Sequence, residues 1–398
     1  MKKYQQPIGL KSIVFGLLGF FAASATCQAA DVYLVAKPFI KPMPDGAQIT
    51  MWGFAADADG NLATDGGETA TVPGPMITVA PTDPVLNIHL RNDLAEEVSL
   101  VIPGQTTSMT PVKFIDGTGR ERVRSFTFET APGATGTYTW NNLRPGTYIY
   151  QSGTHPAVQV QMGLYGAAIQ DTSAGSAYPG VPYVNEMVLF YSEIDPALHA
   201  AVTGGTYGTA AYPSTIDYQP SYFLINGAPY PAATPVVDHK PKPGETLLIR
   251  FLSAALKDHV PVLVGPNMSI VAEDGNLYPY AREQYSVLLS AGKTLDAVVA
   301  PPKGKYSIYD RMLDLTNGAA TGNGGMQTQF FVNGCNGDLN NSGNVNVTDF
   351  SLLLADWGKT NCSSASPCNG DINNDGFVNA ADYSLLLADW GKTNCLTP

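Results

Sequence analysis

The C-terminal part of the chain contains an internal repeat, and this repeat limits the possible folds more than any other feature of the sequence. Residues 351–362 and 384–395 are identical over twelve positions and lie 33 residues apart. The tetrapeptide Cys-Asn-Gly-Asp precedes each copy. A period of 33 residues is far below the length of a domain. The repeat therefore predicts a separate tail built from two small, equivalent units.

Each copy has the ligand spacing of a twelve-residue calcium loop. A hard cation needs six to eight oxygen ligands, and the loop needs a sharp turn at position 6, where both copies have Gly. Position 7 contributes its backbone carbonyl, so an apolar residue is acceptable there. We therefore predict about two bound calcium ions. The predicted ligands at positions 1, 3, 5, 7, 9 and 12 are Asp338, Asn340, Ser342, Asn344, Asn346 and Asp349 in loop one, and Asp371, Asn373, Asp375, Phe377, Asn379 and Asp382 in loop two.

The two loops differ in charge. Loop one has carboxylates at Asp338 and Asp349, whereas loop two has a third carboxylate at Asp375. Since more ligand charge generally gives tighter calcium binding, we expect loop two to fill first.

An apolar stripe at helical spacing follows each loop. Its members recur at i, i+3, i+4 and i+7, and a Gly comes directly after each stripe. Each calcium loop is thus expected to lead into one amphipathic helix. The stripes are Phe350, Leu353, Leu354 and Trp357, and Tyr383, Leu386, Leu387 and Trp390.

Residues 1–30 have the pattern of a secretory signal peptide. Basic residues come before the apolar run 13–25, which is followed by small residues up to Ala30. The run of 13 residues is too short for a transmembrane helix, which needs about 20. We therefore expect export, to the extracellular space or the cell surface, without membrane insertion.

Four cysteines remain once this segment is removed, all of them in the tail: Cys335, Cys362, Cys368 and Cys395. In an exported chain they predict two disulfides within the tail. Three pairings are possible. Repeat symmetry suggests Cys335–Cys362 and Cys368–Cys395, whereas antiparallel packing of the copies equally favours other pairs.

The composition of the body predicts an all-β fold. Only 14% of the residues are charged, while 40 Gly and 30 Pro interrupt the chain, which favours short strands and turns over long surface helices. Short runs of β-branched and aromatic residues between turn residues predict one sandwich over 31–172 and another over 173–333, with the tail at 334–398. The net charge of −12 argues against a nucleic-acid partner.

The tail resembles the dockerin type I module over residues 335–398. The resemblance implies a small α-helical module with EF-hand-like loops that calcium folds, and helices that dock onto a cohesin domain of another protein. Recognition in that family depends on a Ser-Thr-like pair at loop positions 10 and 11. Here those positions are Val347-Thr348 and Ala380-Ala381. The expected partner is therefore a cohesin-like protein or another surface protein.

The body resembles the multicopper oxidases. The stretches that carry the resemblance include Val-Pro-Gly-Pro-Met-Ile-Thr-Val at 72–79, Pro-Gly-Thr-Tyr-Ile-Tyr at 145–150, the block that begins Thr-His-Pro at 154, and Ala-Glu-Asp-Gly at 272–275. The resemblance implies two cupredoxin-like Greek-key sandwiches, which correspond to the first two domains of that family.

The resemblance also indicates where copper ligands are missing. Val101, Pro103, Gln151 and Gly153 occupy the positions of the two His-Xaa-His pairs that feed a trinuclear cluster. No cysteine lies between residues 31 and 334, so a blue copper centre lacks its thiolate. The sequence thus predicts a body with no copper, no catalytic residues and no other cofactor, acting as a secreted scaffold or binding protein.

A second interpretation retains copper at a non-standard site. His155 with Met162, or His259 with Met268, could form a weak copper pair in an oxidoreductase or copper-binding protein. The acidic pair Glu193 and Asp195 is interpreted as part of a solvated turn. The second sandwich is rich in tyrosine, which suits either strand packing or a face for carbohydrate or protein binding.

Overall fold

The computed structural model describes residues 29–63, 67–237, 241–322, 324–362 and 368–396. The predicted signal peptide, apart from its last two residues, lies outside these ranges. Within these ranges, no helix has the length and apolar character needed to cross a bilayer.

The first pair of sheets forms a sandwich around an apolar core. In β4, Leu86, Ile88 and Leu90 are buried and alternate with partly exposed polar residues, which is the period-two pattern of a strand with one face on the core. One sheet has the order β2-β1-β4-β8 and the other β3-β10-β9-β5. The strands are β1 (Ala30–Pro42), β2 (Gln48–Ala56), β3 (Ile77–Val79), β4 (Val85–Asn92), β5 (Leu100–Val101), β8 (Thr135–Asn141), β9 (Gly146–Ser152) and β10 (Tyr165–Gln170).

The second pair of sheets forms another sandwich. Its larger sheet has the order β14-β13-β16-β20-β18-β19 with β15 beside β13, and it faces a sheet of order β17-β21-β22. Strand β16 is buried at every position, as expected for a strand that is covered on both faces. The strands are β13 (Asn185–Ile194), β14 (Tyr222–Ile225), β15 (Val236–Val237), β16 (Leu247–Ser253), β17 (Pro261–Leu263), β18 (Met268–Glu273), β19 (Asn276–Gln284), β20 (Thr294–Val299), β21 (Gly304–Asp310) and β22 (Gln327–Val332).

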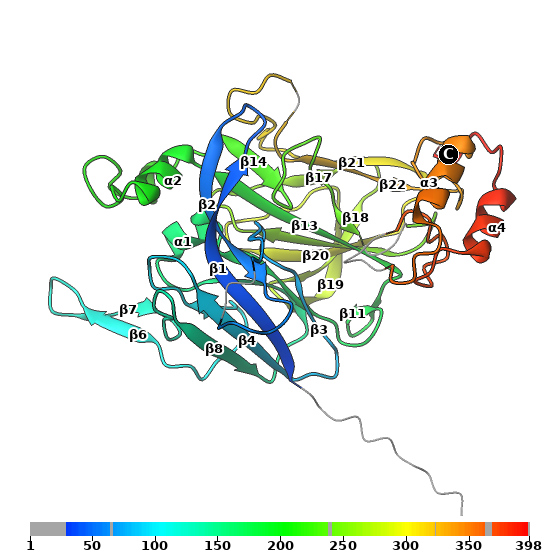
Figure 1. Ribbon diagram of the computed structural model, residues 1–398. Helices are drawn as coiled ribbons and strands as arrows, with labels where there is room; N and C mark the ends of the chain where they lie inside the picture. The colour runs from blue at the N-terminus through cyan, green and yellow to red at the C-terminus, as the bar shows by residue number, and fades with distance from the viewer. Residues whose placement is uncertain (1–28, 64–66, 238–240, 323, 363–367, 397–398) are drawn as a thin grey trace, which may run out of the picture.

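Short elements connect these sheets. They are β6 (Val112–Ile115) and β7 (Glu121–Ser125), which form a hairpin that projects from the body (Figure 1), β11 (Ser176–Tyr178), β12 (Val181–Pro182), α1 (Pro156–Met162), α2 (Pro196–Thr203) and the 3-10 helix η1 (Thr215–Asp217).

The two sandwiches pack against each other through a shared core and a buried polar network. Met51 and Ile149 of the first sandwich belong to the same apolar cluster as Phe190 and Leu252 of the second. The buried Arg250 side chain of β16 donates to Thr147 Oγ1 of β9 at 2.8 Å. The all-β prediction is thus confirmed.

The tail lies at the end of the second sandwich, where β22 leads into loop one (Figure 1). Helices α3 (Val347–Asp356) and α4 (Ala380–Ala388) each begin at position 10 of a predicted calcium loop. The disulfides are Cys335–Cys395 and Cys362–Cys368. The pairing suggested by repeat symmetry is therefore wrong. The longer bridge joins the two ends of the tail across both copies.

Candidate metal sites

The first predicted calcium loop is held closed by its own backbone amides. Asp338 accepts N–H groups from Ser342 at 2.9 Å and from Gly343 at 2.8 Å, and Gly343 has a positive φ of 87°. Asp349, at position 12, accepts N–H groups from Leu339 at 2.9 Å and Asn340 at 3.2 Å. The first and last carboxylates of the loop are fully or almost fully buried. Both ends of the loop thus present carboxylates toward the same small turn.

The second loop repeats this geometry. Asp371 accepts the N–H groups of Asp375 at 3.2 Å and Gly376 at 3.0 Å, and Asp382 accepts those of Ile372 at 2.8 Å and Asn373 at 3.2 Å. The turn at position 6 again has a positive φ, 86°. Two segments of different charge therefore adopt the same closed shape.

The position-9 residues have a second role. Asn346 accepts the N–H of Thr348 at 2.8 Å and Asn379 accepts that of Ala381 at 2.8 Å, so each side chain caps the helix that follows. In calcium loops position 9 often acts through a water molecule, which is compatible with a capping side chain. Phe377, at position 7, has a half-exposed ring and can supply only its carbonyl. The oxygen-rich donor set and the preformed turn fit a hard cation such as calcium.

The predicted apolar stripes of the tail are only partly buried. Leu353 and Leu386 are fully buried in the core of the tail, where Phe350 and Tyr383 pack against them. Their neighbours in each stripe stay about half exposed: Leu354 at 50%, Trp357 at 48%, Leu387 at 47% and Trp390 at 49%. Leu354 and Leu387 lie in α3 and α4, and Trp357 and Trp390 lie just after these helices, so each helix with its C-terminal turn presents one Leu–Trp pair at the surface.

Loop one is also bonded directly to the body. The amide of Asn333, directly after β22, donates to Asp338 Oδ2 at 3.0 Å and to Asn341 Oδ1 at 3.2 Å. Gly334 N–H donates to Cys395 O at 2.9 Å, and Lys303 Nζ donates to Asn394 O at 3.3 Å. Hydrogen bonds at these residues therefore join the tail to the end of the body.

Three of the four positions that the sequence predicts to correspond to copper ligands lie close together. Val101 of β5 and Gln151 of β9 are register partners, and a Cβ added to Gly153 would approach the Val101 side chain to 2.7 Å. Pro103 is exposed and lines a pocket of about 380 Å³ with Tyr148 and Asp274.

A network of buried polar groups lies beside these positions. Ser99 and Ser125 share a hydrogen bond of 2.6 Å, Thr154 donates to Ser99 at 3.0 Å, and Ser152 donates to Gln159 at 2.6 Å. All five side chains are buried. The donor set consists of hydroxyls, an amide and the carboxylate of Glu129, which lies 3.0 Å from Thr154 Oγ1, without imidazole or thiolate, so these residues do not fit a trinuclear copper cluster.

The two predicted histidine–methionine pairs have different surroundings. His155 is exposed at the start of α1 with a positive φ of 41°, whereas Met162 is fully buried at the end of that helix. Met268 is part of the apolar core of the second sandwich. The partners that the structure places beside His259 are carboxylates.

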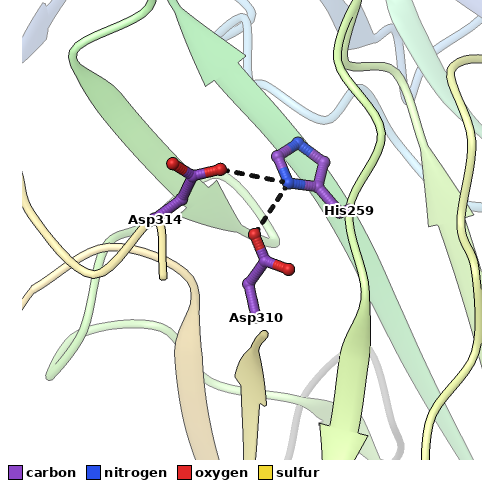
Figure 2. Close-up of side chains that lie close together, drawn as sticks. All are labelled: His259, Asp310 and Asp314. Atoms are coloured by element: carbon purple, nitrogen blue, oxygen red, sulfur yellow. Dashed lines mark hydrogen bonds and ion pairs between the residues drawn. The ribbon is translucent and has the colours of Figure 1, made fainter. Parts of the chain in front are cut away.

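His259 lies in a buried cluster of acidic side chains, part of which is drawn in Figure 2. Its Nδ1 is 3.0 Å from Asp310 Oδ2 and 3.6 Å from Asp314 Oδ2, and its Nε2 is 3.5 Å from Glu193 Oε2. Burial by itself would lower the pKa of His259, but the hydrogen bond to Asp310 and the charge of Glu193 raise that pKa to about 9. Burial and the nearby charge of Asp310 raise the pKa of Asp314 to about 6.

The sequence did not indicate this cluster. Glu193 and Asp195 are both buried, so their interpretation as a solvated turn is wrong: Glu193 belongs to β13, and Asp195 caps α2 by accepting the N–H of Ala197. Glu193, His259 and the Asp310–Asp314 segment are separated from one another by 51 or more positions along the chain. Only the pairing of β17 with β21 brings His259 and Asp310 together.

Many tyrosines of the second sandwich are used for packing. Tyr178, Tyr212, Tyr218 and Tyr222 are buried, and each donates its hydroxyl to a side-chain oxygen, that of an Asp or of Gln161. Tyr280 and Tyr285 are exposed. Strand packing therefore accounts for much of the tyrosine content.

Comparison with known families agrees with both resemblances. Two family models described as multicopper oxidase match residues 66–174 and 192–336, and the dockerin type I domain model matches residues 336–388.

Curated relatives match parts of the body. An L-ascorbate oxidase from Brassica rapa subsp. pekinensis is 28% identical over 249 residues, which cover 55% of this chain and 42% of the relative. A copper resistance protein A homolog from Pseudomonas syringae pv. tomato is 23% identical over 341 residues, which cover 72% of this chain and 54% of the relative. The chain thus spans about half the length of these two relatives.

Solved structures share the fold of the body. The blue copper oxidase from Nitrosomonas europaea superposes with a TM-score of 0.58 at 18% identity, covering 77% of this chain and 86% of that one. The copper nitrite reductase from the same organism gives 0.52 at 22% identity, covering 76% and 94%. The chain therefore belongs to the multicopper oxidase family through its body and carries a dockerin type I domain at residues 336–388.

Proposed function

We propose that this chain is a secreted, non-catalytic scaffold or binding protein that is tethered through its calcium-loaded dockerin tail to a cohesin-like protein or another surface protein. The proposed domain borders are 31–172 and 173–333 for the two sandwiches and 334–398 for the tail. The proposed calcium ligands are the twelve residues of the two loops, with about one ion in each.

The observation that carries the non-catalytic part is the donor set of the first sandwich. Val101, Gln151 and Gly153 stand where the family has imidazoles, and the adjoining buried positions are taken by hydroxyls that satisfy one another. Copper binding at these positions would require imidazole or thiolate ligands, which these residues do not offer. Substrate oxidation through a copper centre of the family's kind therefore has no support in these residues.

The tethering part is supported by the surface of the tail. The Leu–Trp pairs of α3 and α4 leave four large apolar side chains half exposed on one small module. Apolar side chains of this size, aromatic ones above all, are enriched where proteins bind each other. The bonds from Asn333 and Lys303 of the body to the tail support a fixed direction of the body relative to a bound partner.

The tethering test measures binding of the purified chain to a panel of isolated cohesin domains, with calcium and with a chelator. We expect calcium-dependent binding, reduced at least tenfold by the double change Trp357→Ala and Trp390→Ala, since each Trp is an anchor of the kind that dominates interfaces. Tyr280→Ala, which removes an exposed aromatic ring from the body, is the matched control and should bind normally. Binding that persists in chelator would contradict the proposal.

The catalytic part is tested separately. The chain is loaded with cupric ion, dialysed and supplied with a phenol and oxygen. We expect no turnover above that of free copper at the same concentration. Sustained phenol oxidation by the dialysed protein would show that a working copper centre exists in the body.

A further inference from the structure

Four acidic and basic side chains from distant parts of the second sandwich meet at one buried point. Glu193 comes from β13, His259 lies two residues before β17, Asp310 ends β21, and Asp314 lies in the loop after it. His259 and Asp310 are fully buried, and the side chain of Glu193 is as well. Asp314 is 25% exposed and connects the cluster to solvent.

The spacing of three of these groups is within a few tenths of an ångström of one face of a tetrahedral metal site for the two contacts of His259. Two ligand atoms at 2.0–2.2 Å from a tetrahedral ion lie about 3.3–3.6 Å apart. Here His259 Nδ1 is 3.0 Å from Asp310 Oδ2 and 3.6 Å from Asp314 Oδ2. All three ligand atoms lie within 4.8 Å of one another, and Figure 2 shows both carboxylates directed at the same ring nitrogen.

The surroundings of the cluster supply the outer contacts of such a site. Asp310 Oδ1 accepts the N–H groups of Val260 at 2.7 Å and Met312 at 3.2 Å, which leaves Oδ2 for an ion. Glu193 Oε1 accepts the N–H groups of Leu256 at 3.0 Å and Lys257 at 2.9 Å, which directs its other oxygen at the ring of His259.

Two atoms of the cluster lack a hydrogen bond as the structure stands. Within the described part of the chain, His259 Nε2 and Glu193 Oε2 are buried, face each other at 3.5 Å and make no hydrogen bond. A histidine that binds a metal through one nitrogen commonly donates the N–H of the other to a carboxylate, which fixes the tautomer and the ring. Glu193 occupies the place of that carboxylate.

We propose that His259, Asp310 and Asp314 bind one divalent transition-metal ion of the zinc class, with Glu193 as the positioning residue for the imidazole. The ion takes the place of a proton on Nδ1, while Nε2 keeps its proton toward Glu193. One imidazole and two carboxylates leave a fourth position, which water reaches along Asp314. This site goes beyond the tethering function and does not depend on it.

The test uses the full chain with calcium in excess, so that the tail loops are filled, and Zn²⁺ as the probe. We expect about one zinc per chain after dialysis and a zinc-dependent rise in the unfolding temperature of the body. Asp314→Asn should retain less than a tenth of that zinc, because it removes one ligand of a partly exposed residue and keeps the buried His259–Asp310 pair. Glu193→Gln should weaken zinc binding about 10- to 100-fold.

The matched control is Asp31→Asn. Asp31 forms another histidine–carboxylate contact of the described chain, 2.8 Å from His89, on an exposed edge. This variant should bind zinc normally. Substitution of wild type with Co²⁺ gives an independent readout, since a tetrahedral site produces visible d–d absorption. Failure of wild type to retain zinc, or an equal loss of bound zinc in Asp31→Asn and Asp314→Asn, would show that the cluster is a buried ion pair and not a metal site.

Discussion

Buried carboxylates occur in both the tail and the body, but what neutralises them differs. In the body, Asp171, Glu186 and Asp296 surround Arg250, which is fully buried. Its Nη2 lies 2.6 Å from Asp171 Oδ1, and its Nε pairs with Glu186. In the tail, Asp338, Asp349 and Asp382 are buried as deeply as Asp296 and more deeply than Asp171 and Glu186. No Lys or Arg lies within the two loops.

The difference shows two ways to keep charge inside a small core. A carboxylate without a compensating charge is costly to bury, so each region needs a cation. The body encodes its cation as Arg250. The tail uses backbone N–H groups and, under our proposal, calcium from solution. The stability of the body should therefore be independent of calcium, and the stability of the tail should depend on calcium.

Removal of calcium should have the largest effect. A chelator is expected to abolish the helical signal of α3 and α4, because metal binding and folding are coupled in such loops. A site filled at 1,000 times its dissociation constant contributes about 4 kcal/mol, and two sites contribute twice that. The measurement is far-UV circular dichroism with and without chelator, followed by refolding with calcium. Unfolding of the sandwiches together with the tail would show that the junction at Asn333 makes them one cooperative unit.

Loss of Arg250 should have the next largest effect, and only in the body. Asp296, Glu186 and Asp171 hold the pKa of Arg250 above its ordinary value even though burial alone would lower it. Arg250→Met leaves these carboxylates uncompensated and should cost about 3–5 kcal/mol of the free energy of unfolding. Urea unfolding in saturating calcium measures it.

The control for Arg250→Met adds Asp171→Asn and Glu186→Gln in the same chain. Removing these charges should recover part of the lost stability, because buried charges without partners are the cause. An Arg250→Met variant as stable as the parent would show that the body does not need the charge of Arg250 to bury these carboxylates.

The two loops should differ by a smaller amount. Loop two has an Asp at position 5 where loop one has Ser342, so we expect about tenfold tighter binding in loop two, or about 1.4 kcal/mol. Calorimetric calcium titration should show two steps. Exchanging the residues, Ser342→Asp and Asp375→Ser, should reverse the order of filling. An unchanged order would mean that the bond from Asn333 to Asp338, and not the ligand charge, decides the affinity.

The sequence revealed the tail better than the body for a physical reason. All ligands of a calcium loop lie within twelve consecutive residues, and each apolar stripe lies within eight, so local patterns were sufficient. Strand β19 was missed because it is exposed along nearly its whole length and shows no apolar alternation. Residues 285–289, whose apolar side chains are typical of a strand, form only isolated bridges, Val262 with Ser286 and His259 with Leu289.

Sites built from distant strands were beyond local patterns. Arg250 stands within the apolar run of β16, and nothing near it in sequence indicates the carboxylates that it meets. The cluster at His259 depends in the same way on the register of β17 with β21. The disulfide pairing suggested by repeat symmetry was wrong for a related reason. Repeat symmetry in the sequence does not determine which ends of the two copies meet.

The smallest predicted effect tests a positive charge that burial disfavours despite the nearby carboxylate of Asp195. His199 of α2 is buried, its Nδ1 lies 2.8 Å from Thr50 O, and burial lowers its pKa from the ordinary value of 6.5. The unfolded chain therefore binds a proton below pH 6.5 that the folded chain does not, and stability falls as pH decreases from 6.5 toward the lowered pKa. The loss from this one proton is at most about 0.8 kcal/mol at pH 6.

His199→Gln keeps a donor for Thr50 O and should flatten this part of the pH profile of body stability, measured in saturating calcium. His155→Gln, on an exposed residue, should leave the profile unchanged. Because all five histidines lie before residue 260, the tail cannot contribute to the histidine part of the profile. A profile equally steep in parent and His199→Gln would mean that a group other than His199 causes the loss; Asp314 is not such a group, because its raised pKa of about 6 makes stability rise as pH decreases.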